Sequence, residues 1–309
     1  MRIVSLLPSA TEIVCALGLE EDLVGVTFEC DHPPVARTKR VVSDTALPRA
    51  LAPGEIDRVV STQADAHRSL YTLAEDALRE LDPELVITQD LCAVCAVDVA
   101  DVSDALAHLG CTGRVVTLDP KRLDDVIASV VTVGTAAGTR YAARDVVARL
   151  RARLARVAAA VSSARRRRVF VLEWTEPPYN AGHWIPDMVT AAGGEAVRAR
   201  PGEYSVPTAW HDIRDAHPEV VVVAPCGYDL PGATALVTSD AGLRARLADV
   251  CGPDGEVWAV DASAYFVRPG PRVVDGVEIL AGMLHPARVA PPSPAVAQQV
   301  AVGREASAR

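Results

Sequence analysis

Aromatic side chains are scarce in this chain of 309 residues, which has four tryptophans, six tyrosines and three phenylalanines. Long apolar runs are missing too, because no stretch approaches the roughly 20 apolar residues that a membrane-spanning helix needs. The apolar run from Ile3 to Leu7 stops at Pro8 and is too short for the core of a signal peptide. We therefore expect a cytoplasmic protein with no membrane insertion.

Basic residues are outnumbered by acidic ones, 31 to 40. The formal net charge is −9, with 23% charged and 50% hydrophobic residues, which is typical of a soluble globular protein long enough for two domains. An acidic balance argues against a nucleic-acid partner. The single basic run, Arg165 to Arg168, follows a long helical pattern, and we interpret it as cations that complement the helix dipole.

Short β-rich runs alternate with helical patterns in both halves of the chain, which predicts the α/β class with Rossmann-like parallel sheets. In the first half these runs are 3–6, 10–19, 40–43, 70–81, 85–88, 99–109 and 115–118. In the second half they are 169–173, 185–192, 210–216, 220–224, 243–249, 257–261 and 274–284. Ser9 and Glu12 form a capping-box pattern at the start of the first helix, and Gly18 occupies the position of a C′ glycine.

A proline-free stretch separates the two halves. From Leu123 to Val161 apolar residues recur at helical spacing, which predicts one rod of about 60 Å at 1.5 Å per residue. We therefore expect two α/β lobes joined by one long α-helix, with a ligand cleft between the lobes. The predicted boundaries are an N-terminal lobe at 1–119, the connecting helix at 120–166, a C-terminal lobe at 167–289 and a disordered tail at 290–309.

Several short motifs, taken in order, resemble one family. They are Leu7-Pro8-Ser9-Ala10-Thr11-Glu12, Glu29-Cys30-Asp31-His32-Pro33, Asp82-Pro83-Glu84-Leu85-Val86-Ile87, Pro177-Pro178-Tyr179 with Gly182, and Arg268-Pro269-Gly270-Pro271-Arg272. With this order the chain resembles the cobalamin-binding solute proteins, which are class III substrate-binding proteins of ATP-driven importers. The resemblance extends from about Ile3 to Leu284 and implies a cobalamin, corrinoid or similar metal chelate as the ligand. It also implies a possible membrane permease as partner.

The resemblance also implies which residues bind the ligand. In the first lobe they are Ser9, Glu29, Asp31 and Gln89, and in the second lobe they are Trp174, Tyr179, His183, Trp184, Tyr228, Tyr265 and Phe266. Most of the few aromatic residues lie after Arg168, so we expect a planar macrocycle to find its apolar contacts mainly on the second lobe.

The seven cysteines fall into two groups. Cys15, Cys111 and Cys251 are expected to be buried and inert, whereas Cys30, Cys92, Cys95 and Cys226 are expected at cleft-facing ends of the lobes. The Cys92-x-x-Cys95 pair, completed by Cys30 and by Cys226 or His183, has the donors of a zinc site or an iron–sulfur cluster. The alternatives are a redox dithiol, a thiolate or the His183 imidazole directed at a corrinoid cobalt, or ordinary loop residues.

Catalytic signatures are missing from the sequence. It shows no Ser–His–Asp order, no phosphate-binding glycine loop and no His-Glu-x-x-His pattern, so nothing requires an enzyme. Three hypotheses follow: a chelate receptor without chemical turnover, a metalloprotein or enzyme on the cleft cysteines, and a partner-binding scaffold.

Overall fold

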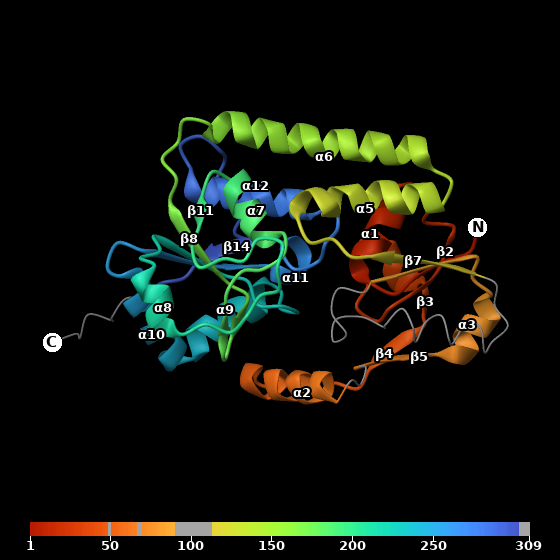
Figure 1. The fold of residues 1–309 in the computed structure, drawn as a ribbon, viewed down its shortest axis with the longest axis horizontal. Coiled ribbons are helices and arrows are strands. Elements are labelled where there is room, and N and C mark those ends of the chain that lie inside the picture. The colour runs from red at the N-terminus through yellow and green to blue at the C-terminus, as the bar shows by residue number, and fades with distance from the viewer. Residues whose placement is uncertain (49–50, 67–69, 90–112, 303–309) are drawn as a thin grey trace. The chain divides into compact units, whose positions relative to one another are not determined.

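The computed structural model describes residues 1–48, 51–66, 70–89 and 113–302. They form two compact units, unit 1 with residues 1–120 and 124–150, and unit 2 with residues 121–123 and 151–309. Each unit is built around its own five-stranded sheet, and Figure 1 shows helices covering both sheets. The predicted α/β class with parallel sheets is confirmed.

The sheet of unit 1 is parallel throughout and has the order β3-β2-β1-β6-β7. Its strands are β1 (Ile3–Ser5), β2 (Leu23–Val26), β3 (Arg40–Val41), β6 (Leu85–Gln89) and β7 (Arg114–Leu118). Strands β1 and β6 are buried along their whole length, as expected for central strands of a parallel sheet covered on both faces. A separate two-stranded antiparallel sheet pairs β4 (Ser43–Thr45) with β5 (Tyr71–Leu73).

The helices of unit 1 begin with α1 (Pro8–Ala16). The others in the described part of unit 1 are η1 (Pro34–Thr38), α2 (Pro53–Asp65), α3 (Glu75–Leu81), α5 (Leu123–Ala136) and the first half of α6 (Arg140–Val161). The capping-box prediction for α1 is wrong: Leu7 is the N-cap, and Ser9 lies inside the first turn without a capping hydrogen bond. The helix starts earlier because Pro8 fits a first-turn position, having no N–H to satisfy. The predicted end is confirmed, since Gly18 follows the C-cap with φ of 75°.

The sheet of unit 2 has the order β11-β8-β12-β13-β14, in which only the β13–β14 pair is antiparallel. Its strands are β8 (Arg168–Leu172), β11 (Glu195–Ala196), β12 (Val220–Val223), β13 (Glu256–Val260) and β14 (Ala297–Gln299), and a small hairpin pairs β9 (Trp174–Thr175) with β10 (Pro178–Tyr179). Its helices are α7 (Ile185–Ala191), α8 (Trp210–Asp215), α9 (Leu230–Ser239), α10 (Ala241–Cys251), α11 (Ala262–Tyr265) and α12 (Val273–Leu284). Phe170, Val221 and Leu247 are central to the apolar core between sheet and helices.

The predicted single rod is wrong. Two helices occupy that stretch, α5 and α6 (Arg140–Val161). Gly138 between them has φ of 76°, a left-handed conformation that ends a helix and that glycine adopts without strain. Gly134 also lies so close to Ala143 that a side-chain carbon on Gly134 would come within 2.5 Å of the Ala143 Cβ. Small residues therefore turn the chain where the apolar periodicity predicted continuity.

The C-terminal stretch is more ordered than expected. Ala297–Gln299 forms β14 and pairs with Trp258–Val260 of β13, and Ala297 and Val300 are buried. The prediction of a disordered tail from residue 290 therefore differs from the structure up to residue 302, and 303–309 lie outside the described residues. Backbone pairing along an open strand edge needs no long apolar pattern, which explains the error.

Candidate functional site

Three parallel strands of unit 2 end at the same edge of its sheet. The segments that follow β8, β12 and β13, together with a neighbouring loop, form what we call the carboxyl edge of unit 2: residues 173–184, 198–206, 224–228 and 261–266. Backbone hydrogen bonds join these segments, since Cys226 N donates to Glu173 O at 3.1 Å and Ser263 N donates to Tyr228 O at 3.1 Å. In open α/β sheets ligands bind at this edge.

Two aromatic side chains meet on this edge. The ring centroids of Trp174 and Tyr228 are 6.0 Å apart with an interplanar angle of 66°. The Trp174 indole N–H donates to Glu176 O at 3.1 Å, which fixes the ring on its hairpin, and Tyr179 pairs with Trp174 across that hairpin. Three predicted ligand residues, Trp174, Tyr179 and Tyr228, are thus brought to one edge.

A second aromatic group lies on the loops that follow. The rings of His183 and Tyr204 meet edge to face with centroids 5.0 Å apart, and Tyr204 is 52% exposed. The Lys121 ammonium lies 4.9 Å from the Tyr204 ring centroid, within cation–π range. His183 itself has φ of 47°, in the left-handed region. Tyr204 and Lys121 were missed by the sequence reasoning because neither belongs to a recognised motif.

The far end of the edge combines a carboxylate, a ring and a cation. Asp261 caps α11 by accepting from Ala264 N at 2.8 Å, and burial raises its pKa. The Arg272 guanidinium lies 5.7 Å from the Tyr265 ring centroid. The predicted residue Tyr265 therefore belongs to a cation–π pair that the sequence did not reveal.

Glu173 stands directly at the end of β8. Its Oε1 accepts from Gly182 N at 2.8 Å, and the Ser205 hydroxyl hydrogen-bonds the same carboxyl group. The residue keeps partial exposure, but its carboxyl group is enclosed. Burial raises the pKa of Glu173 to about 7, against the lowering effect of the two hydrogen bonds.

Two predicted ligand residues are core residues instead. Phe266 has no exposed surface, and Trp184 is only 4% exposed. The Trp184 indole N–H donates to Phe266 O at 2.7 Å, so its polar tip is satisfied inside the unit. A fully buried ring has no face left for a ligand, and the assignment of Phe266 is wrong for that reason.

The predicted residues of unit 1 lie at the carboxyl ends of its strands. Ser9 and Gln89 are buried, whereas Glu29 and Asp31 lie partly exposed on the turn after β2. A buried hydrogen bond from Ser43 Oγ to Thr27 Oγ1, at 2.8 Å, joins strand β4 to this turn.

The turn after β2 also carries an aromatic pair that the sequence reasoning missed. The Phe28 and Tyr71 ring centroids are 6.0 Å apart with an interplanar angle of 30°, and Phe28 is 39% exposed. The expectation that rings belong mainly to the second lobe overlooked this surface. The available signal was the position of Phe28, which directly precedes the Glu29-Cys30-Asp31 turn of the resemblance.

Two of the four cysteines predicted as metal ligands, Cys30 and Cys226, lie among the described residues, one in each unit. Cys30 is buried with its Sγ 3.0 Å from Thr11 Oγ1, and Cys226 is exposed in unit 2. Cys92, Cys95 and Cys111 lie outside the described residues, so the Cys-x-x-Cys hypothesis stays a prediction. No three His, Cys, Asp or Glu side chains among residues 1–48, 51–66, 70–89 and 113–302 converge on a metal position.

Two cysteines that were predicted to be inert have raised pKa values. Burial raises the thiol pKa of Cys15 to about 11 and of Cys251 to about 12, as expected for inert thiols.

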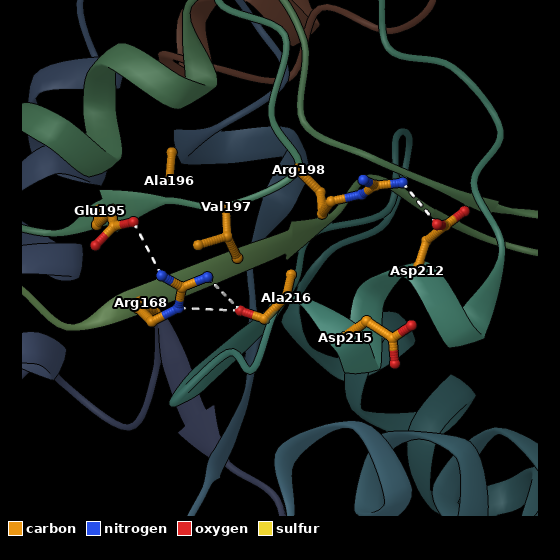
Figure 2. A pocket seen from close by; sticks show the side chains of 8 residues that line it. All are labelled: Arg168, Glu195, Ala196, Val197, Arg198, Asp212, Asp215 and Ala216. Atoms are coloured by element: carbon orange, nitrogen blue, oxygen red, sulfur yellow. Dashed lines mark hydrogen bonds and ion pairs between the residues drawn. The ribbon is translucent and has the colours of Figure 1, made fainter.

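A hollow of about 390 Å³ in unit 2 lies around the first residues of β8 and β11 and shares only Arg198 with the carboxyl edge (Figure 2). Its lining residues are Arg168, Glu195, Ala196, Val197, Arg198, Asp212, Asp215 and Ala216. Both arginines are already paired, Arg168 with Glu195 at 3.2 Å and Arg198 with Asp212 at 2.9 Å. We therefore place the candidate site at the carboxyl edge and regard this hollow as an ion-paired surface.

Comparison with known proteins supports one family. The sequence model of the periplasmic binding protein family matches residues 3–242. An uncharacterized ABC transporter substrate-binding lipoprotein, YvrC of Bacillus subtilis, is 25% identical over 301 residues, which cover 92% of this chain and 80% of that protein. In the described part of this chain, no helix is both long and apolar enough to cross a membrane.

Solved structures show the same fold. A periplasmic heme-binding protein from Pseudomonas aeruginosa superimposes with a TM-score of 0.68 at 20% identity, covering 97% of this chain and 98% of that chain. The periplasmic vitamin B12 binding protein BtuF of Vibrio cholerae superimposes with a TM-score of 0.66 at 22% identity, covering 93% and 97%.

Proposed function

Because the chain belongs to the periplasmic binding protein family, we propose that it captures a planar metal chelate, a corrinoid such as cobalamin or a heme, for an ABC-type importer. The proposal covers binding without chemical turnover. Its ligand class is supported by two structural neighbours that are described as heme-binding and vitamin B12-binding proteins.

The observation that carries the proposal is the collection of rings on the carboxyl edge of unit 2. In a chain with only 4% Phe, Trp and Tyr, the residues Trp174, Tyr204, Tyr228 and Tyr265 all lie on this one edge, together with the His183 imidazole. A macrocycle presents a large apolar face, and indole and phenol rings remove that face from water while keeping a polar tip for hydrogen bonding. The Phe28–Tyr71 pair offers a similar surface on unit 1.

Two cations held against aromatic residues of this edge suit the rim of such a ligand. Lys121 lies over the Tyr204 ring and Arg272 over the Tyr265 ring, so each cation is held beside an aromatic face. Polar groups at the margin of an apolar surface orient a ligand, whereas the apolar area supplies most of the affinity. Carboxylate or amide groups on the rim of a chelate are suitable partners for these two cations.

A membrane permease is the proposed protein partner, supported by the description of the Bacillus relative as a transporter substrate-binding lipoprotein. The cytoplasmic location stays a prediction. Fractionation of the native host with an antibody to the chain tests it, and recovery in a membrane or envelope fraction would contradict it.

A ligand panel tests the proposed function. Cyanocobalamin, dicyanocobinamide and hemin are titrated into the purified full chain, with absorbance spectra and isothermal calorimetry as the two measurements. We expect a shifted absorbance band and a dissociation constant of about 1 μM or lower for at least one of the three. Binding weaker than about 1 mM for all three would end the proposal.

A matched variant shows whether the binding is specific to the carboxyl edge. Trp258 lies within β13, where its indole N–H is bonded to Glu256 Oε2 at 3.0 Å, away from the strand ends. Trp258→Phe therefore removes a tryptophan without changing the proposed ligand surface, and it is expected to bind like the wild type.

A further inference from the structure

Two segments of the carboxyl edge are pressed together at Gly182. A side-chain carbon at Gly182 would come within 2.3 Å of Ser205 N, so only glycine permits this approach. Next to it, His183 N donates to Glu203 O at 2.7 Å and Gly202 N donates to His183 O at 2.9 Å. The contact places His183 of one segment against Tyr204 of the other.

The Glu173 side chain links the two segments at this junction by hydrogen bonds. Its carboxyl group accepts from the Gly182 N–H at 2.8 Å and is hydrogen-bonded by the Ser205 hydroxyl, so one side chain binds both segments. Its main chain is anchored as well, because Glu173 N donates to Tyr179 O at 3.2 Å and Glu173 O accepts from Cys226 N at 3.1 Å. The carboxyl group therefore projects from a fixed point of the sheet.

We infer that Glu173 is the positioning residue of the ligand surface, an inference that rests on the proposed function. By binding both Gly182 and Ser205, it holds the His183 and Tyr204 ring centroids 5.0 Å apart. These two rings are part of the surface that we propose contacts the chelate. Glu173 acts through these neighbours, and contact between its own carboxyl group and the ligand is not required.

The role is that of a hydrogen-bond acceptor and not of a charge. The titratable and charged side chains on the adjoining segments are Glu176, Tyr179, His183, Arg198, Arg200, Glu203, Tyr204, Cys226 and Tyr228. Among the described residues no such group affects the Glu173 carboxyl through its charge, and burial dominates. A glutamine at this position keeps an acceptor for Gly182 N–H and offers N–H to the Ser205 oxygen, since a hydroxyl both donates and accepts.

The first measurement needs no ligand. With the two ring centroids 5.0 Å apart, we expect the Tyr204 ring to shift the NMR signals of the His183 imidazole C–H groups. Selective labelling resolves the seven histidines, and His183→Gln assigns the signal. Tyr204→Leu defines the shift that is lost when the ring is absent. We expect Glu173→Ala to move the His183 signals most of the way to that limit, and Glu173→Gln to leave them near the wild-type position.

The second measurement uses cyanocobalamin and hemin as probes. We expect Glu173→Ala to bind whichever probe the wild type binds at least about tenfold more weakly, and Glu173→Gln to stay within about twofold. Glu195→Ala is the control, because it removes a carboxylate that pairs with Arg168 at the amino ends of the strands and leaves Gly182 and Ser205 untouched. It is expected to behave like the wild type in both measurements.

Unchanged His183 signals in folded Glu173→Ala would overturn the inference, even if its melting temperature fell, because a purely structural role lowers stability without releasing the ring pair. Loss of the shift in Glu173→Gln would overturn it too. If Glu173→Ala does not fold, Ser205→Ala, which deletes only one of the two donors, must give an intermediate shift. A wild type that binds neither probe would remove the proposed function, while the ligand-free NMR result would still decide the role of Glu173.

Discussion

The Trp174 indole and the Tyr228 ring meet edge to face at 6.0 Å, although they follow different strands of the sheet. Trp174 comes just after β8 and Tyr228 just after β12, and the two strands are parallel neighbours in register from Val169 to Leu172. The sheet therefore brings the rings together at its carboxyl edge. Their contact forms one continuous aromatic surface from two separate turns.

Removing the indole should weaken chelate binding. We expect Trp174→Ala to raise the dissociation constant for cyanocobalamin or hemin at least about tenfold, because it deletes a large contact area and the support for the Tyr228 ring. Tyr228→Phe keeps the ring and should change the constant by less than about threefold. Isothermal calorimetry with Trp258→Phe as the control gives the comparison, and equal affinities for Trp174→Ala and Trp258→Phe would contradict the site.

Sequence reasoning recognised the ends of the strands better than it recognised which side chains lie exposed there. The strand ends at Glu173, Tyr228 and Asp261 were recognisable because apolar runs stop there and polar or aromatic residues follow. The burial of Phe266 was not recognisable, since a phenylalanine next to Tyr265 looks the same whether it points outward or inward. The pairings of Tyr204 with His183 and of Phe28 with Tyr71 depend on loops that carry no periodic pattern.

Two fold elements in stretches that contain proline, glycine or serine were also missed by the sequence reasoning. Helix α9 contains Pro231 and Gly232, which hid a helix whose first turn is capped by Asp229. Strand β14 lies in a stretch rich in proline and serine and is held by backbone pairing with β13. In both cases tertiary contacts override weak local preference.

The basic run Arg165 to Arg168 shows the same limit for charge. Helix α6 ends at Val161, so the helix-dipole interpretation is wrong. Arg165 pairs with Glu219, Arg167 with Glu256 at 2.6 Å and Arg168 with Glu195 at 3.2 Å, so the run joins the amino ends of neighbouring strands. A run of basic residues in a sequence indicates that acidic residues pair with it, but it does not identify those acidic residues.

Within unit 2, Arg153 of α6 is a stability element. It donates to Asp275 at 2.5 Å and to Glu278 at 2.6 and 3.0 Å, both on α12, and these hydrogen bonds raise its pKa. We expect Arg153→Met to lower the free energy of unfolding by about 1–2 kcal/mol, since the group is partly buried and bidentate. The loss should shrink in 1 M salt, roughly by half, because screening weakens the wild-type pairs.

Tryptophan fluorescence during urea unfolding measures this loss in unit 2 alone, because all four tryptophans, Trp174, Trp184, Trp210 and Trp258, lie in that unit. Arg156→Met is the control, since Arg156 is exposed on the same helix and should change the free energy by less than about 0.5 kcal/mol. A loss that is equal for both variants, or that grows with salt, would contradict the pairing.

The buried carboxyl group of Glu173 should make unit 2 less stable as pH rises. Burial raises its pKa from 4.5 to about 7, so between these values the folded state holds a proton that the unfolded state has released. Stability therefore falls with rising pH across this window, because the unfolded state binds fewer protons there. The full shift corresponds to about 3 kcal/mol in the free energy of unfolding, and since Glu173 keeps partial solvent contact we expect a measured change of about 1–2 kcal/mol.

Glu173→Gln removes this pH-dependent contribution, so its stability relative to the wild type should increase from pH 5 to pH 8 in fluorescence-monitored urea unfolding. Glu203→Gln, on the neighbouring loop, should follow the wild-type profile, and parallel profiles for Glu173→Gln and the wild type would show that the carboxyl group is not buried.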